Sequence, residues 1–178
     1  MRLPWRKPKV PAGVRDAVEL IGDERVYLSA QSHEGSYVVA SSHALVLVVP
    51  QDGGPQYRVE WRVRWDQIDL AKWQPPLLKM DIRSAEAHSG PATEHIDVVI
   101  DQATELPAVV RDRVDQSFVV NEEIPVGDGV ARVVARTHSD TGETTWRVIM
   151  GPDLDPQDEA ARAEAAAGLA QLRSKLGV

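Results

Sequence analysis

Hydrophobic and polar residues alternate most regularly over Tyr57–Trp65, where the sequence reads Y-R-V-E-W-R-V-R-W. The odd positions are aromatic or β-branched, and the even positions are charged. Side chains along a β-strand point to opposite faces in turn, so this pattern predicts a strand with one buried and one exposed face. We therefore expect Trp61 and Trp65 to lie in the core of the protein, beside Val59 and Val63.

Most of the chain between Arg25 and Ile100 has the pattern of short strands joined by turns. Further strands are predicted at 25–32, 36–41, 44–49, 77–83 and 96–101. Residues 66–72 are predicted to form a tight turn or a single helical turn, with Ile68 and either Leu70 or Ala71 facing inward.

Residues 44–49 (A-L-V-L-V-V) are apolar at every position. Such a run is typical of a strand that is covered on both faces. Three elements are candidates to cover its outer face, namely a short helix predicted at 11–21, the C-terminal helix and a partner subunit.

The C-terminal part of the chain alternates between helical and strand patterns. A helix is predicted at 104–115, and a hairpin from 130–137 and 144–150. A strand is predicted at 117–120, with a sheet edge as one candidate position. The last helix is expected at about 156–176, with Asp155 as its N-cap. Its buried stripe should consist of Ala161, Ala165, Leu169, Leu172 and Leu176.

The first residues form a basic segment that differs from the rest of the chain. Prolines at positions 4, 8 and 11 predict a flexible tail over residues 1–11. Its functional residues would be Trp5 and four cations, Arg2, Arg6, Lys7 and Lys9. They are either a peripheral anchor for anionic lipid, in which tryptophan sits at the membrane interface, or a leader without a role of its own.

Composition and charge narrow the class of protein. With 178 residues and no cysteine, the chain fits one domain, expected over residues 12–178, without disulfides or thiolate sites. It has no apolar run that could span a membrane and no signal-peptide core, so we expect a cytoplasmic location. Because the chain carries −7 and its first nine residues carry +4, the rest carries −11, which argues against nucleic-acid binding.

Arg58, Arg62 and Arg64 are predicted to share the exposed face of the strand at Tyr57–Trp65. They could bind an acidic partner, since guanidinium groups bind carboxylates well. They could equally be a solvated row paired with acids on neighbouring strands, which the acidic chain favours. The same two interpretations apply to arginines predicted on the outer faces of the late hairpin, namely Arg132, Arg136 and Arg147.

No pattern in the sequence indicates a reaction centre. There is no G-x-S-x-G motif and no glycine-rich loop that opens a helix, so we expect a non-enzymatic protein without a cofactor. His88 and His95 share a predicted loop with Glu86 and Glu94, but their spacing matches no compact metal motif. The acids Asp153, Asp155, Asp158 and Glu159 are better explained by helix capping than by calcium binding.

The order of elements resembles that of bacterial pleckstrin-homology-like (PH-like) domains. The resemblance rests on the hairpin Gly35–Val49, on W-R-V-R-W-D-Q-I at 61–68, and on Asp155–Leu176. The chain is also similar to uncharacterised actinobacterial proteins that share W-x-x-I and a terminal helix. The resemblance implies a mainly β fold (α+β by content), a bent antiparallel sandwich or partly open barrel of seven strands, with a capping C-terminal helix. Residues 103–123 are extra to this pattern.

Members of that fold class bind lipids, peptides or proteins, and the fold alone does not choose among them. We expect a cytoplasmic interaction module that binds a protein or peptide and can also self-associate. The alternative is a membrane-peripheral domain that binds anionic lipid through its tail. A small-molecule-binding or catalytic β domain is the third hypothesis, and it requires a deep pocket lined by convergent polar groups.

Overall fold

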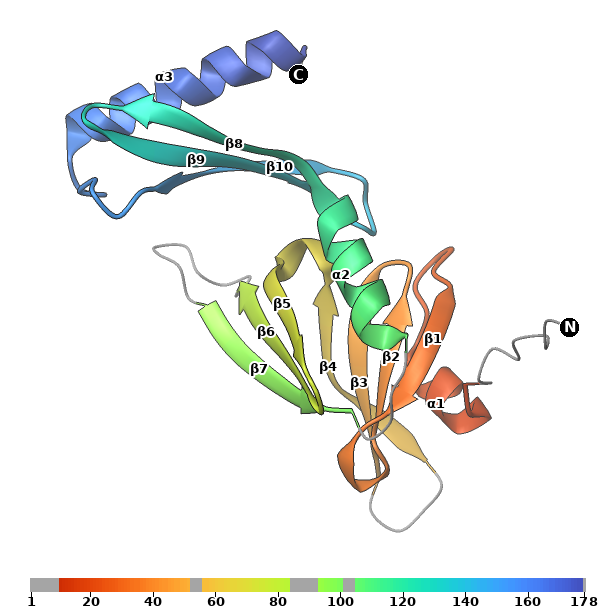
Figure 1. Ribbon diagram of the computed structural model, residues 1–178. Coiled ribbons are helices and arrows are strands. Elements are labelled where there is room, and N and C mark those ends of the chain that lie inside the picture. Colours follow the sequence, from red (N-terminus) through yellow and green to blue (C-terminus); the bar gives the residue numbers. More distant parts are fainter. Residues whose placement is uncertain (1–9, 52–55, 84–92, 101–104, 178) are drawn as a thin grey trace, which may run out of the picture. The chain divides into compact units, whose positions relative to one another are not determined.

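The computed structural model describes residues 10–51, 56–83, 93–100 and 105–177 (Figure 1). In these residues the protein is mainly β, as predicted, and it has ten strands in three antiparallel sheets together with three α-helices. Its contacts group the chain into two compact units. The first runs to Ser117 and includes Ser139–Thr141, and the second comprises Phe118–His138 and the residues from Gly142 onward. The prediction of one domain over 12–178 stays a prediction.

The first unit contains two sheets, ordered β1-β2-β3-β4 and β5-β6-β7. Its elements are α1 (Ala12–Ala17), β1 (Val26–Gln31), η1 (His33–Gly35), β2 (Tyr37–Ser41), β3 (Ala44–Pro50), β4 (Tyr57–Arg64), η2 (Trp65–Gln67), β5 (Ile68–Gln74), β6 (Leu77–Arg83), β7 (Thr93–Val99) and α2 (Leu106–Ser117).

The two sheets of the first unit form an open sandwich that is joined at one corner and capped by a helix. At the corner, Ser32 and Ile100 make an isolated antiparallel bridge, and the Ser32 hydroxyl donates to the carbonyl oxygen of Val99 at 2.7 Å. The helix α2 contacts β1 and β2 of one sheet and β5 of the other (Figure 1). Its buried residues Leu106 and Val110 are 0% exposed, so α2 contributes directly to the core.

A bulge in β4 changes the face of the sheet to which part of the alternating stretch Tyr57–Trp65 points. Leu47 pairs with Trp61, but the next residue, Val48, pairs with Val59, so Glu60 is an extra residue in β4. Consecutive residues of β3 point to opposite faces, and their partners on β4 must do the same. The prediction that all odd positions of Tyr57–Trp65 share one face is therefore wrong.

The two tryptophans of this stretch differ in burial, although both follow the bulge. Trp65 is 1% exposed, and its indole N–H donates to the carbonyl oxygen of Ser41 at 3.2 Å. Trp61 is only half-buried. Tyr57 and Val59, on the other side of the bulge, pack against the core cluster under α1.

The helix α1 covers the outer face of β3. Val14 and Val18 are 0% exposed and form a cluster with the equally buried Ala44, Val46 and Val48. The first of the three candidates for this cover is therefore confirmed. The helix is shorter than the predicted 11–21, because it ends at Ala17. The following chain leaves the helical conformation, with Glu19 at a φ of 48° and Ile21 61% exposed.

Residues 66–72 are not the simple turn that was predicted. A short 3-10 helix, η2, leads directly into β5, which pairs with β6. Ile68 faces the core and is 0% exposed, whereas Leu70 points outward and is 54% exposed. The sequence missed this strand because Asp69 is an extra residue opposite β6, and such a bulge interrupts the alternation.

The second unit is a three-stranded sheet with one helix. Its elements are β8 (Phe118–Val126), β9 (Gly129–Thr137), β10 (Thr144–Met150) and α3 (Glu159–Leu176), and the sheet order is β10-β9-β8. Figure 1 shows α3 running along one face of this sheet.

The helix α3 buries most of its predicted stripe against the sheet. Ala161, Ala165 and Leu172 pack on residues of β8, β9 and β10, whereas Leu176 is 49% exposed. The N-cap is Asp158, whose carboxylate accepts from the backbone N–H of Ala160 at 2.9 Å. The predicted cap, Asp155, instead accepts from the N–H of residue 157 in the preceding turn.

Gly151→Ala is expected to destabilise the protein by about 1–3 kcal/mol, because an added Cβ would lie 2.3 Å from the backbone carbonyl oxygen of Val130. Backbone atoms paired in a sheet cannot move aside cheaply. Urea unfolding followed by circular dichroism measures the change.

Gly168→Ala in α3 is the matched control. Its Cβ would meet only the end of the Ile124 side chain, at 2.7 Å, and that side chain can rotate. Alanine also favours the helix by up to about 1 kcal/mol. A Gly151→Ala variant as stable as Gly168→Ala would contradict the close approach of Gly151 to β9.

Candidate functional site

Several predicted site residues lie outside the described residues. They are the tail residues Arg2, Trp5, Arg6, Lys7 and Lys9, together with Glu86 and His88 of the predicted polar loop. The lipid-binding interpretation of the tail residues stays a prediction.

The arginines of β4 do not form one row. The bulge at Glu60 places Arg58 on the face opposite that of Arg62 and Arg64. Each has a carboxylate beside it. The Nη1 of Arg58 lies 2.5 Å from Oε2 of Glu60, and the Nε–H of Arg64 donates to Oδ1 of Asp66 at 3.0 Å. Arg62 pairs with Glu24.

The arginines of the second-unit hairpin also differ from one another. Arg132 is exposed, as predicted for the outer face of a hairpin. Arg136 is 1% exposed, and its guanidinium carbon lies 4.0 Å from the centre of the Phe118 ring. The outward position predicted for Arg136 is therefore wrong: its side chain is buried and makes a cation–π contact with Phe118.

The described histidines and acids form no metal centre. His95 lies on β7 and not in a loop, and its Nδ1 is 2.6 Å from Oδ1 of Asp81 across the sheet. In the part of the chain that the structure describes, no group of three His, Asp or Glu side chains could hold a metal ion. Of the acids near the start of α3, Asp158 caps the helix and Asp155 accepts a hydrogen bond in the preceding turn.

The sequence did not reveal a buried polar cluster around Glu24. The Glu24 side chain is fully buried, and its carboxylate accepts from the Ser41 hydroxyl, from the guanidinium of Arg62 and, at 3.0 Å, from the N–H of Ile21. Arg62 also donates to the carbonyl oxygen of Val18 at 3.1 Å. The cluster thereby fixes the segment after α1 to the sheet.

The pKa of Glu24 is determined by opposing effects. Burial raises this pKa, but the hydrogen bonds from Ser41, from the backbone N–H of Ile21 and from Arg62 outweigh burial, so the pKa lies below its ordinary value. Glu24 is therefore held as a carboxylate at neutral pH. A carboxylate whose acceptor sites are occupied in this way stabilises the fold and is unsuited to proton transfer.

The strand β5 is an edge strand of the first unit. It is the first strand of the β5-β6-β7 sheet, and among the described residues it pairs only with β6. Over Leu70–Gln74 its other side therefore has no second strand beside it. The helix α2 contacts β5. We call the side of Leu70–Gln74 that faces away from β6 the β5 edge.

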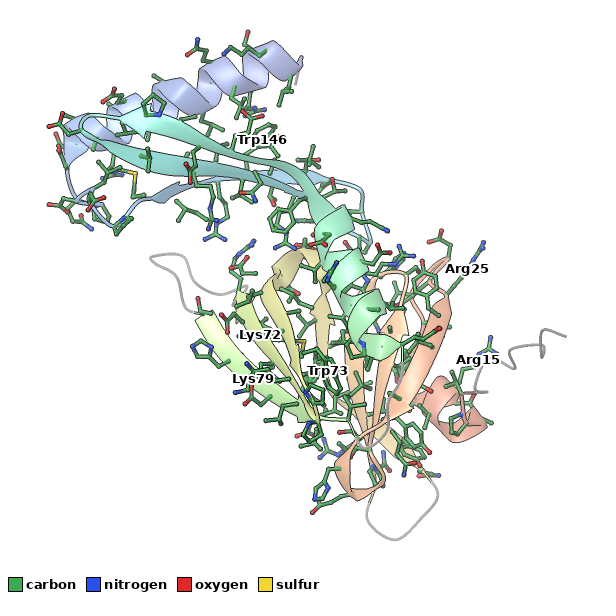
Figure 2. The ribbon with its side chains drawn as sticks, viewed as in Figure 1. Arg15, Arg25, Lys72, Trp73, Lys79 and Trp146 are labelled. Atoms are coloured by element: carbon green, nitrogen blue, oxygen red, sulfur yellow. The ribbon has the colours of Figure 1, made fainter. Side chains whose placement is uncertain are left out.

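The two faces beside the β5 edge have different chemistry. On the outer face lie the exposed Leu70 and Lys72, with Lys79 directly opposite Lys72 on β6. On the inner face lie Ala71 and Trp73, both half-buried. Figure 2 shows Lys72 and Lys79 on one side of the sheet and Trp73 on the other. A partner strand added to this sheet would therefore lie beside Leu70 and Lys72 on the outer face and beside Trp73 on the inner face.

Comparisons with known proteins add no identity: no family model and no curated protein matches the chain. None of the described helices combines the length and the apolar composition that crossing a membrane would demand.

Proposed function

We propose that the protein is a non-enzymatic interaction module that binds an extended segment of a partner protein along the β5 edge. The observation that carries this proposal is an edge strand with one strand neighbour among the described residues and with the exposed Leu70 near its middle. In this kind of recognition the main chain of the added strand supplies hydrogen bonds, and alternate side chains supply specificity.

The order of elements in the first unit supports a PH-like assignment. Four strands in one antiparallel sheet and three in the next are followed by α2, which contacts both sheets. This is the arrangement that the resemblance implies, with α2 in the place expected for the C-terminal helix. The segment that appeared extra in the sequence therefore supplies the cap.

The other sheet edges of the first unit are less suited to an added strand. Tyr27 on β1 is covered by the guanidinium of Arg113, which lies 4.2 Å from the ring centre. The strand β4 is interrupted by its bulge at Glu60, and β7 carries Glu94 and Asp97. Bulges and charged residues are the means by which proteins protect edges from pairing. The strand β5 has its own bulge at Asp69, so the stretch offered for pairing is Leu70–Gln74, in which Lys72 is the charged residue.

Selection of displayed peptides on the full-length chain tests this function. We expect the selected peptides to bind as strands, so that amide hydrogen exchange slows in β5 on binding. Leu70→Glu is expected to weaken binding about tenfold or more, because it places a charge at the centre of the edge.

The matched control is Val119→Glu, since Val119 is 57% exposed on β8 of the second unit. This variant should bind as the parent chain does. Slowed exchange on a strand other than β5, or equal binding by Leu70→Glu, would contradict the proposal. Sedimentation of the free chain identifies a second copy as the partner if a dimer is present and Leu70→Glu dissociates it.

A further inference from the structure

The first unit has a cavity between α1 and the start of β1. Its volume is about 690 Å³, and it is lined by residues of α1 and of the segment that leads into β1. The lining residues are Val10, Ala12, Arg15, Asp16, Leu20, Glu24, Arg25 and Val26. This volume lies within the range of roughly 300–1,000 Å³ that is common for small-molecule sites.

Part of the cavity wall is apolar. Val10, Ala12, Leu20 and Val26 supply aliphatic side chains to its walls. Leu20 is 36% exposed and its neighbour Ile21 is 61% exposed, so the apolar surface continues to the rim. Removing such surface from water favours a ligand with an apolar body.

Another part of the cavity wall is cationic. Arg15 on α1 and Arg25 just before β1 are both exposed, and neither makes an ion pair with any residue that the structure describes (Figure 2). Of the two lining acids, Glu24 is paired with Arg62, so Asp16 is the acid that remains. The lining therefore carries a surplus of positive charge, and guanidinium groups bind carboxylates and phosphates through paired N–H donors.

The wall formed by the segment after α1 is fixed in place before any ligand binds. Glu24 accepts from the N–H of Ile21 at 3.0 Å, and Arg62 donates to the carbonyl oxygen of Val18 at 3.1 Å. These bonds connect both ends of the segment that carries Leu20 to the sheet. A site whose walls are held by its own hydrogen bonds loses less free energy to ordering when it binds.

We propose that this cavity is a binding site for a small amphiphile with one anionic head, such as a free alkyl carboxylate. Arg15 and Arg25 hold the head, and the alkyl chain lies against the aliphatic wall. The site shares no residue with the β5 edge. It needs no residue of the basic tail.

Titration of the full-length chain with decanoate, below the concentration at which it forms micelles, tests the proposal. We expect saturable shifts of the amide NMR signals of residues 12–16 and 24–26, and none with decylamine. Arg15→Gln and Arg25→Gln are each expected to weaken decanoate binding about tenfold, because each removes a charge-assisted hydrogen bond. Ala12→Trp, which fills the cavity, should abolish the shifts.

Arg111→Gln is the matched control, since Arg111 is an exposed arginine on α2, with its Nε 4.0 Å from Asp115. This variant should bind decanoate as the parent chain does. Equal binding of decylamine, or unchanged affinity in both Arg15→Gln and Arg25→Gln, would overturn the proposal. Binding to phosphatidylglycerol vesicles without any binding of free decanoate would overturn it as well, because the anionic head group would then belong to a membrane lipid and not to a free amphiphile.

Discussion

Trp65→Ala is expected to lower the free energy of unfolding by about 3–5 kcal/mol, the range for removing a large aromatic side chain from a core. Trp65 is 1% exposed and follows directly on β4. The substitution would leave a cavity and would also leave the carbonyl oxygen of Ser41 without the donor that now lies 3.2 Å away. Urea unfolding followed by fluorescence of the remaining tryptophans measures the loss.

Trp61→Ala is the matched control for this prediction, because the two residues are of the same type and four positions apart. Trp61 is half-buried, so its removal should cost less, about 1–2 kcal/mol. Trp65→Phe covers the case in which Trp65→Ala does not fold: it keeps the ring and loses the N–H donor, at a cost of about 1–3 kcal/mol. Equal losses in the Trp61→Ala and Trp65→Ala variants would contradict the different burial of the two side chains.

The strands with unbroken patterns could be predicted from the sequence. The uniformly apolar run 44–49 became β3, and the hairpin at 130–137 and 144–150 became β9 and β10. In these strands each position keeps its face from end to end, so that local pattern and final burial agree. Periodicity is reliable where the chain repeats one geometry.

Bulges are the reason that other faces could not be predicted. A single extra residue, Glu60 in β4 and Asp69 in β5, exchanges the faces of everything beyond it, yet neither residue departs from ordinary strand composition. In β4 this moved Arg62 from an assumed solvated row to the side of the sheet that α1 covers. In β5 it hid the strand itself, and with it the candidate binding edge.

The cluster around Glu24 could not be predicted for a different reason. Locally, I-G-D-E-R has the composition of a polar turn. The groups that define its chemistry are the hydroxyl of Ser41 and the guanidinium of Arg62, which are 17 and 38 residues away in the sequence. Only the pairing of β2, β3 and β4 brings them to one place. A buried carboxylate therefore had no local signal.

Arg62→Met is the second substitution with a large expected effect. It should destabilise the protein by about 3–5 kcal/mol at neutral pH, because it leaves the carboxylate of Glu24 buried without its cation. Arg58→Met is the matched control on the same strand. The partner of Arg58, Glu60, has a side chain that is 43% exposed, and exposed pairs contribute about 0–1 kcal/mol. Chemical unfolding of both variants and the parent chain measures the difference.

The pH dependence separates this charge effect from a simple loss of packing. In the parent chain the pKa of Glu24 is lowered, so its contribution to stability is fully present above its ordinary value of 4.5 and is lost as the pH falls through the folded-state pKa. Without Arg62, burial is opposed by fewer hydrogen bonds and the pKa of Glu24 should rise. In the Arg62→Met variant, the free-energy cost of burying the charged Glu24 should therefore decrease as the carboxylate is protonated at low pH. The stability difference between parent and variant should therefore shrink from pH 7 to pH 4, and a difference that stays constant would mean that Arg62 acts through its packing alone.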